Sequence, residues 1–224
     1  MKRKIVVTDD GSSSIFAEEI NQYYHSHFGA VQESMHIFIE TGLCCHSLSH
    51  LKNISVLEIG FGTGLNALLS CLKADELKKS IYYETIELYP LTHQEAAQLN
   101  YPDILPYPNT KELFSTLHSA AWNKEQIITN NFTLHKRQIS AIDATYIPNR
   151  FNLVYFDAFS PEVQPELWRE ELLKSIYECL EKDGILLTYC TKGIVKKTLK
   201  EIGFQIKKLP GPIGKREILR ATKE

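Results

Sequence analysis

The sequence of 224 residues has no long apolar run and no low-complexity segment. No stretch approaches the ~20 consecutive apolar residues that a membrane-spanning helix needs. The chain begins Met-Lys-Arg-Lys-Ile-Val-Val-Thr, and this apolar run ends after three residues, whereas a secretory signal needs about 7–15. These absences favour a soluble, unexported protein without a membrane partner, and we expect a cytoplasmic location.

The five cysteines follow no pairing or metal-binding pattern. Their number is odd, none forms a C-x-x-C motif, and Cys44 and Cys45 are adjacent, which fits neither a disulfide framework nor a zinc ribbon. The eight histidines form no H-E-x-x-H motif, and the chain has no Walker loop. We therefore expect reduced, mostly buried cysteines and no metal site.

The composition is that of a folded domain. Hydrophobic residues make up 43% and charged residues 23% of the chain, which excludes a disordered chain, a collagen and a coiled coil. A chain of this length is within the range of one domain, and it shows no internal repeats. We predict a single domain over residues 1–224.

The formal net charge is -2, but the charges are unevenly distributed. The segment from Lys192 to Glu224 holds ten Lys or Arg and three Glu, so the rest of the chain is acidic. A basic end on an acidic body favours a polyanionic partner such as nucleic acid. A solvated surface helix and strand would explain the same charges.

Apolar runs and helical periodicity alternate along most of the chain, which predicts an α/β fold with a doubly wound, mostly parallel sheet. The last two expected strands are joined by Pro-Gly-Pro-Ile-Gly turn chemistry, which predicts an antiparallel hairpin at the C-terminus. This architecture is that of class I S-adenosylmethionine-dependent methyltransferases, which are Rossmann-like. Strands are predicted at Ile54–Ile59, Ser80–Glu87, Thr133–Ile139, Phe151–Phe156, Gly184–Cys190, Gly203–Leu209 and Lys215–Ala221, and helices at Gly64–Lys73, Thr92–Leu99, Glu166–Leu180 and Lys192–Ile202.

Two stretches lie outside this alternation. Residues 1–50 precede the first unit and contain an aromatic cluster around Tyr24, so we expect an N-terminal elaboration that caps the sheet or the pocket, with the Rossmann-like core over residues 51–224. Residues 100–131 begin with three prolines and are less regular, which predicts an insertion between units.

A glycine-rich turn follows the first core strand and precedes a helix. Its spacing is G-x-G-x-G, and the dinucleotide fingerprint would require the third glycine where Leu65 stands. The acid before the turn suits an amine-bearing ligand, such as the methionine part of S-adenosylmethionine, better than a pyrophosphate. A turn that merely packs the helix on the strand is the alternative. The candidate cofactor-binding residues here are Glu58, Gly60, Gly62, Thr63, Gly64 and Asn66.

Two further acids stand at expected strand ends. Glu87 ends the second strand, where an acid can accept both ribose hydroxyls of a bound nucleoside. Asp157 ends a strongly apolar strand, at an edge that should open onto the same crevice, and could receive either the cofactor or an amine substrate. Alternatively, Glu87 is a solvated acid and Asp157 caps the helix that follows.

The assembled motifs resemble the MnmC-like tRNA methyltransferases, a family that methylates 5-aminomethyl-2-thiouridine. The resemblance extends over nearly the whole chain, including Asp10-Gly11, Tyr24-His25-Ser26 and the segment from Glu33 to Ile39. The motifs are EIGFGTGLN (58–66), ELYPLT (87–92), DAFSPEVQPELW (157–168), TYCTKGIVKK (188–197) and GPIGKREIL (211–219).

The resemblance implies a reaction and a partner. The family transfers a methyl group from S-adenosylmethionine to the amine of 5-aminomethyl-(2-thio)uridine at the tRNA wobble position, giving the 5-methylaminomethyl derivative. Some members carry a second, flavin-dependent domain, for which this chain is too short, so we expect the standalone form. Two rivals remain: a methyl- or aminopropyltransferase of the same fold that acts on a small amine, and a non-catalytic RNA-binding relic of the fold.

For the implied reaction we hypothesise roles for individual residues. Asp157 would hydrogen-bond the amine and orient its lone pair or take its proton, and Phe159, together with Tyr189, would stack on or enclose the uracil. The acid that usually contacts adenine is displaced or replaced, which leaves Gln138, Ser140 and Asp143 as candidates. The residues expected to bind phosphates of the anticodon stem-loop are Lys192, Lys196, Lys197, Lys215 and Arg216.

Overall fold

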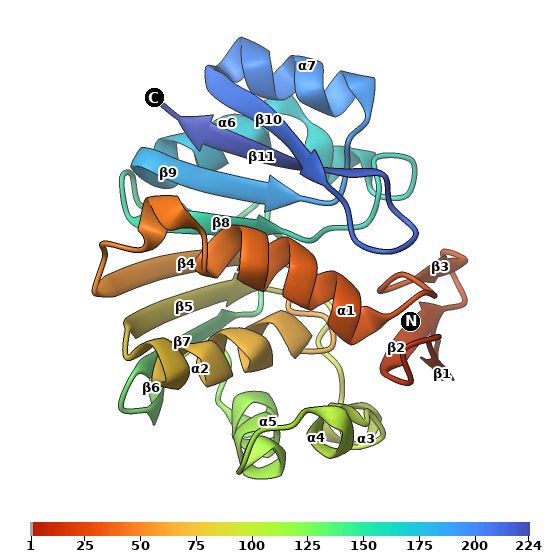
Figure 1. The fold of residues 1–224 in the computed structure, drawn as a ribbon. Helices are drawn as coiled ribbons and strands as arrows, with labels where there is room; N and C mark the ends of the chain where they lie inside the picture. The colour runs from red at the N-terminus through yellow and green to blue at the C-terminus, as the bar shows by residue number, and fades with distance from the viewer. Residues whose placement is uncertain (1) are drawn as a thin grey trace.

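The computed structural model describes residues 2–224, and a large mixed sheet forms its centre (Figure 1). The strands of this sheet are β4 (Asn53–Ile59), β5 (Ser80–Ile86), β6 (Lys124–Thr129), β7 (Phe132–Arg137), β8 (Phe151–Phe156), β9 (Leu180–Thr188), β10 (Phe204–Pro210) and β11 (Glu217–Lys223). Their order across the sheet is β10-β11-β9-β8-β4-β5-β7-β6. The five strands from β9 to β7 are mutually parallel, whereas β11, β10 and β6 pair in antiparallel fashion. The predicted α/β fold, with its C-terminal antiparallel hairpin, is confirmed.

Helices cover both faces of the sheet because its central strands are apolar on both sides. Successive residues of β4 show this: Val56 belongs to one buried cluster and Leu57 to the other. The first face is covered by α1 (Ala30–Ser34), which continues into the π-helical turns of η1 (Met35–Leu43), and by α2 (Leu65–Leu77) and α5 (Thr110–Ser119). The second face is covered by α6 (Glu170–Cys179) and α7 (Gly193–Ile202). The remaining short helices are η2 (His46–Leu48), α3 (His93–Ala96), α4 (Tyr101–Ile104) and η3 (Pro165–Trp168).

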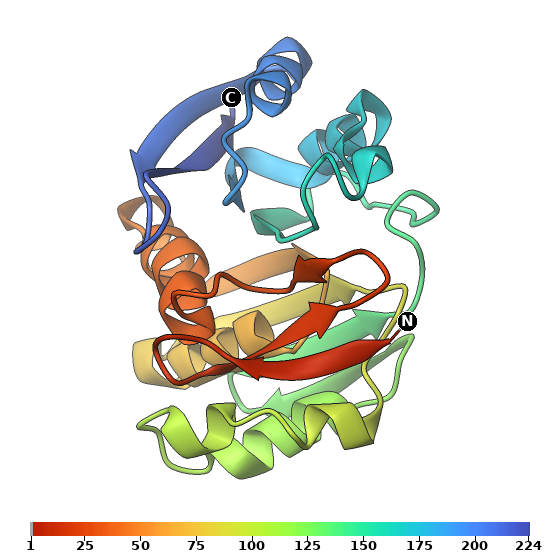
Figure 2. The ribbon, with the colours of Figure 1, turned by 90° about the vertical axis from the view of Figure 1, so that its right-hand side faces the viewer.

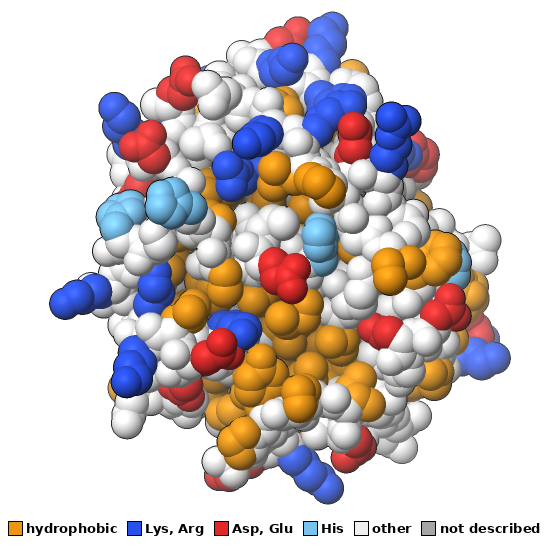
Figure 3. All heavy atoms as spheres, viewed as in Figure 1, with side chains coloured by type: hydrophobic (Ala, Val, Ile, Leu, Met, Phe, Trp, Pro, Cys, Tyr) orange, Lys and Arg blue, Asp and Glu red, His pale blue; other side chains and the backbone are white. Residues whose placement is uncertain are grey.

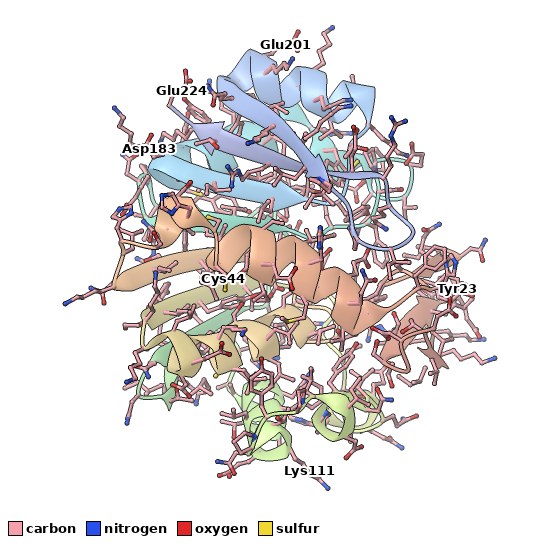
Figure 4. The ribbon with its side chains drawn as sticks, in the orientation of Figure 1. Tyr23, Cys44, Lys111, Asp183, Glu201 and Glu224 are labelled. Atoms are coloured by element: carbon pink, nitrogen blue, oxygen red, sulfur yellow. The ribbon has the colours of Figure 1, made fainter. Side chains whose placement is uncertain are left out.

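The N-terminal residues form a separate three-stranded sheet of β1 (Arg3–Val7), β2 (Ser13–Ala17) and β3 (Gln22–Tyr23). This sheet lies beyond the carboxyl ends of the central strands (Figures 1 and 2), and Tyr23 marks its outer side (Figure 4). Asp10 joins it to α1 by accepting hydrogen bonds from the amides of Ser12 (2.9 Å) and Gln32 (3.0 Å). The N-terminal segment therefore faces the strand ends where ligands of α/β folds bind.

Residues 100–131 are more regular than their prolines suggest. They contain α4, α5 and β6, and β6 pairs with β7 as an edge strand of the large sheet. Phe114 and Leu117 of α5 are buried in the first cluster, so this stretch is part of the core. Lys111 of α5 and Glu201 of α7 lie at opposite ends of the molecule in Figure 4.

The C-terminal hairpin returns to the N-terminal segment. The His36 Nε2 atom lies 2.8 Å from the carbonyl oxygen of Pro210, and Gly214 packs so closely against the Phe28 ring that no side chain would fit there. The turn between β10 and β11 is thus fixed beside α1. No helix within residues 2–224 combines the length and the apolar character that crossing a bilayer requires.

Candidate active site

A cavity of about 450 Å³ opens at the carboxyl ends of β4, β5 and β8. Its walls come from the glycine-rich loop, from the residues that follow β5 and β8, and from residues 139–142. Residues 22–28 of the N-terminal segment and the β10–β11 turn complete it. The crevice that the sequence predicted thus gains two walls from the ends of the chain.

Two glycines of the glycine-rich loop bring their backbone to the cavity. Gly60 has a φ of +94°, and a Cβ atom there would lie 3.1 Å from the carbonyl oxygen of Asp157. Gly62 has a φ of +51°, and a Cβ atom there would lie 3.3 Å from the Tyr24 ring. Both positions therefore require glycine on account of conformation and space. Of the other predicted residues of this loop, Thr63 and Asn66 also line the cavity.

Glu87 follows β5 directly and lines the cavity beside the glycine loop. Its two carboxylate oxygens accept hydrogen bonds from the amides of Gly62 (3.0 Å) and Tyr89 (2.8 Å). These bonds fix the carboxylate while leaving it lone pairs for a ligand, since an ionised carboxyl group has about four acceptor sites.

Two of the residues predicted to bind the cofactor lie beneath the cavity. The Glu58 side chain is fully buried and accepts a hydrogen bond from the Thr85 hydroxyl (2.8 Å). Burial raises the pKa of Glu58 to about 8, so the carboxyl group is largely protonated at neutral pH. Gly64 packs against His118 and Phe61, where a Cβ atom would lie 2.9 Å from the His118 ring. Both residues support the loop from below.

Asp157 lies between the glycine loop and the N-terminal wall. Its amide donates to the carbonyl of Ile59 (3.2 Å), and its Oδ2 accepts from the Asn66 side chain (2.9 Å). Burial, followed by the nearby negative charge of Glu33, raises the pKa of Asp157 to about 7, against the opposing effects of Asn66 and Lys215. A carboxyl group with such a pKa can exchange a proton near neutral pH.

Aromatic rings form the wall next to Asp157. The Phe159 and Tyr24 rings meet edge to face, with centroids 5.2 Å apart. The indole nitrogen of Trp168 donates to the Phe159 carbonyl (2.8 Å), and its ring packs on Phe156. The Tyr189 hydroxyl donates to the Ala158 carbonyl (2.9 Å). The tryptophan of the D-A-F-S-P…P-E-L-W motif therefore holds the loop that carries Phe159.

Glu33 is a cavity residue to which the sequence reasoning assigned no role. It extends from α1, and its carboxylate accepts from the Ser26 amide (2.7 Å) and the Lys215 ammonium (2.8 Å). Lys215, predicted to contact RNA, thus lines the cavity, with its ammonium 5.2 Å from the Tyr189 ring centroid. Glu33 and Lys215 both lie in segments that resemble the MnmC-like family, but no spacing in the sequence relates position 33 to position 215.

The other basic residues predicted to contact RNA do not line the cavity. Lys192 pairs with Glu162, and Lys197 lies 3.8 Å from Glu201 on α7. Lys208 holds the pKa of Glu217 below its usual value, and the charges of Arg216 and Lys196 lower it further, which places these two residues near that acid. Figure 3 shows Lys and Arg side chains gathered over α7 and the β10–β11 hairpin.

Of the three candidates for adenine contact, Ser140 lines the cavity, in an otherwise apolar wall of Ile139, Ala141 and Ile142. The amide of Gln138 donates to Asn123 (3.0 Å), and the Asp143 amide donates to the Ser140 carbonyl (3.1 Å), outside the lining. Within residues 2–224, no group of three or more His, Cys, Asp or Glu side chains could hold a metal ion.

Comparison with known proteins places this site in a family. The sequence profile of the S-adenosyl-L-methionine-dependent methyltransferases matches residues 107–224, which is more than half of the chain. The chain belongs to this methyltransferase family. The family assignment agrees with the glycine loop and the acid after β5, both of which face the cavity.

Relatives identify the MnmC type within this family, which confirms the resemblance drawn from the motifs. The chain is 26% identical, over 96% of its length, to the tRNA 5-methylaminomethyl-2-thiouridine biosynthesis bifunctional protein MnmC of Burkholderia thailandensis, and 28% identical, over 92%, to the protein of that name from Actinobacillus pleuropneumoniae. It spans about a third of the length of these relatives. The crystal structure of MnmC2 from Aquifex aeolicus matches all of this chain and 70% of its own, with a TM-score of 0.83 and 25% identity.

Proposed function

We propose that this methyltransferase transfers a methyl group from S-adenosylmethionine to the amine of 5-aminomethyl-(2-thio)uridine at the tRNA wobble position, giving the 5-methylaminomethyl nucleoside. The observation that carries the proposal is the placement of Asp157. Its carboxyl group stands within one cavity between the glycine loop and an acidic, aromatic end. The names of these relatives contain the proposed product, 5-methylaminomethyl-2-thiouridine.

The cavity residues fit S-adenosylmethionine. Gly60 and Gly62 line the cavity, and because they carry no side chain a ligand can approach their backbone closely. Glu87 is oriented to accept hydrogen bonds from ribose hydroxyls, and the wall around Ser140 suits an adenine ring. When bound, this cofactor supplies a methyl group already activated by a sulfonium, so the protein need not provide a metal or a strong acid.

The chain's own residues then have two tasks. An alkylamine reaches the site mainly as an ammonium ion, and its nitrogen needs a free lone pair before it can accept a methyl group. Asp157, with a pKa near 7, can accept that proton and keep a hydrogen bond to the nitrogen. Phe159 and Tyr24 enclose the base, and such positioning is worth roughly 7–11 kcal/mol of the barrier.

An RNA substrate is supported by the surface around the cavity. Tyr23, Leu88 and Tyr89 are exposed at its rim, where aromatic rings can stack on unpaired bases. Lys196, Lys197 and Arg216 add positive charge on α7 and the hairpin, where phosphates can be held without reading sequence.

The test is a methyl-transfer assay on three acceptors. These are a tRNA bearing 5-aminomethyluridine at the wobble position, the same tRNA with unmodified uridine, and a free polyamine. We expect transfer to the first alone, with the product nucleoside heavier by one methylene in mass spectrometry. Transfer to the polyamine alone would favour the small-amine rival. Binding of both tRNAs with no transfer would favour the RNA-binding relic.

A further inference from the structure

The cavity is strongly acidic for a site that would receive part of a polyanion. Its described lining includes four acids, Glu33, Glu87, Asp157 and Glu166, and a single Lys or Arg, which is Lys215. Glu87 lies beside the glycine loop, whereas Glu33 and Asp157 lie next to Lys215 and the aromatic wall. An acidic pocket repels phosphates, so this end suits a cationic group that projects from the RNA.

The negative charge of the acids near Asp157 exceeds the positive charge that the protein places there. Burial lowers the pKa of His25 to about 4 and raises that of Glu58 to about 8, so both are mainly uncharged at neutral pH, as are the surrounding tyrosines. Glu33 binds the ammonium of Lys215 directly, and Asp157, whose pKa near 7 leaves it partly ionised, lies close to both charges. A buried carboxylate is costly without a partner, and a second ammonium would supply it.

Lys215 already shows which group this end accepts. Its side chain ends in a primary ammonium on a methylene carbon, bound to the Glu33 carboxylate and lying against the Tyr189 ring. Glu33 itself is held in place by the Ser26 amide, and its side chain is 10% exposed. An aminomethyl group has the same terminal chemistry as this lysine.

We propose that Glu33 and Asp157 together form the receptor for the primary ammonium of the methyl acceptor, with Lys215 as the internal competitor for Glu33. The inference rests on the proposed function and assigns Glu33 a specificity role within it. When the acceptor ammonium enters, Glu33 holds it next to Asp157, and Lys215 turns toward the open mouth of the cavity.

The test compares two anticodon stem-loop RNAs that differ in one group at the wobble position, 5-aminomethyluridine or 5-hydroxymethyluridine. Dissociation constants are measured with S-adenosylhomocysteine present, so that no turnover occurs. The ratio of the two dissociation constants measures the contribution of the ammonium group to binding, because both RNAs share all phosphate and base contacts. The variants are Glu33→Gln and Lys215→Met, with Glu76→Gln as control, since Glu76 pairs with Lys73 on α2, away from the cavity.

We expect the wild-type protein and Glu76→Gln to prefer the amine RNA strongly. Glu33→Gln should reduce this preference by about ten- to a hundred-fold, the range expected for one hydrogen bond to a charged group. Lys215→Met should increase it several-fold, since the competitor is gone. S-adenosylhomocysteine affinity should change less than about two-fold in every variant.

If the ion pair between Glu33 and Lys215 only fastens the hairpin to α1, the binding constants should change in a different way. Glu33→Gln and Lys215→Met would then weaken the binding of both RNAs by the same factor, and the ratio of the two dissociation constants would not change. That result would overturn the inference and leave the methyl-transfer proposal intact. If the wild-type protein shows no preference for the amine, the inference fails, whereas the methyl-transfer assay on the three acceptors tests the proposed function separately. Should Glu33→Gln not fold, Lys215→Met decides, because an unchanged or smaller ratio contradicts the competitor role.

Discussion

The two ends of the cavity are built in different ways. At the cofactor end, where we propose that S-adenosylmethionine binds, the glycine loop and Glu87 each follow directly from a core strand, and Glu87 is held by two backbone amides. At the acceptor end, where we propose that the amine binds, Asp157 also follows a core strand, β8, but Glu33 and Lys215 come from α1 and the hairpin turn and are joined by an ion pair.

Because the two ends are built differently, substitutions at each end should alter different properties of the protein. A site made from backbone at strand ends is in place once the parallel sheet has formed. A site made from side chains of α1, the β8 loop and the hairpin turn requires those segments to meet. Substitutions at the acceptor end should therefore affect acceptor binding and the methyl-transfer step, and those at the cofactor end should affect cofactor binding.

The largest effect is expected from Asp157→Asn, which keeps the shape of the side chain but removes its charge. The single-turnover rate of methyl transfer should fall by roughly 10²–10⁴-fold, the usual contribution of a positioned acid–base group. The wild-type rate should fall below about pH 7 as Asp157 becomes protonated, and higher pH should partly restore the variant by supplying free amine.

Cofactor binding provides the control for this variant. S-adenosylmethionine affinity, measured by calorimetry, should change far less than the rate, because the loss belongs to the transition state. A rate loss that follows a loss of cofactor affinity would instead mean that Asp157 only shapes its loop.

Glu87→Ala tests the cofactor end. Loss of hydrogen bonds between a charged carboxylate and the ribose should weaken S-adenosylmethionine binding by about ten- to a hundred-fold in calorimetry. The preference for the aminomethyl RNA should stay as in the wild-type protein. Unchanged cofactor affinity in a folded Glu87→Ala protein would contradict the placement of the ribose.

A triple variant that neutralises Lys196, Lys197 and Arg216 tests the surface outside both ends. RNA binding should weaken alike for all sequences, and the slope of log affinity against log salt should become shallower by roughly 0.9 per lost phosphate contact. Cofactor affinity should not change. An unaltered slope would place the RNA-binding surface elsewhere on the protein.

The smallest effect concerns Glu58, beneath the cofactor end. Its pKa is raised from 4.5 to about 8, so the folded state holds a proton that the unfolded state has lost. The free energy of unfolding should therefore carry a term that falls as pH rises from 4.5 to about 8, by at most ~1.4 kcal/mol per pH unit. Denaturant titrations of Glu58→Gln should lack this term, whereas identical slopes in both proteins would show that Glu58 is ionised in the fold.

Most of the core could be predicted from the sequence because its signals are local. The strand Phe151–Phe156 was predicted with the bounds that the structure shows, since five of its six residues are apolar, as suits a strand buried on both faces. The helix predicted at Glu166–Leu180 is divided in the structure into the short helix η3 and the helix α6, which begins at Glu170. The extended backbone of Arg169 separates the two, and the Trp168 indole is bonded to the Phe159 carbonyl rather than packed along α6.

The edge strand β6 was not predicted. None of its residues Lys124–Thr129 is buried, and Ile127 is exposed, so no alternating apolar pattern marks it as a strand. It forms because β7 offers an unpaired edge, which is a property of the sheet rather than of the segment.

Local pattern determined the parallel sheet, the glycine turn and the two acids at strand ends, since each depends on neighbours within a few residues. Tertiary structure decided that Glu58 supports the loop from below, that Lys215 turns into the cavity, and that Glu33 meets it there. The pairing of residues 33 and 215 depends on the N-terminal segment and the hairpin packing together, through His36 at Pro210 and Phe28 at Gly214. No periodicity in the sequence records such contacts, because they join segments whose separation along the chain is arbitrary.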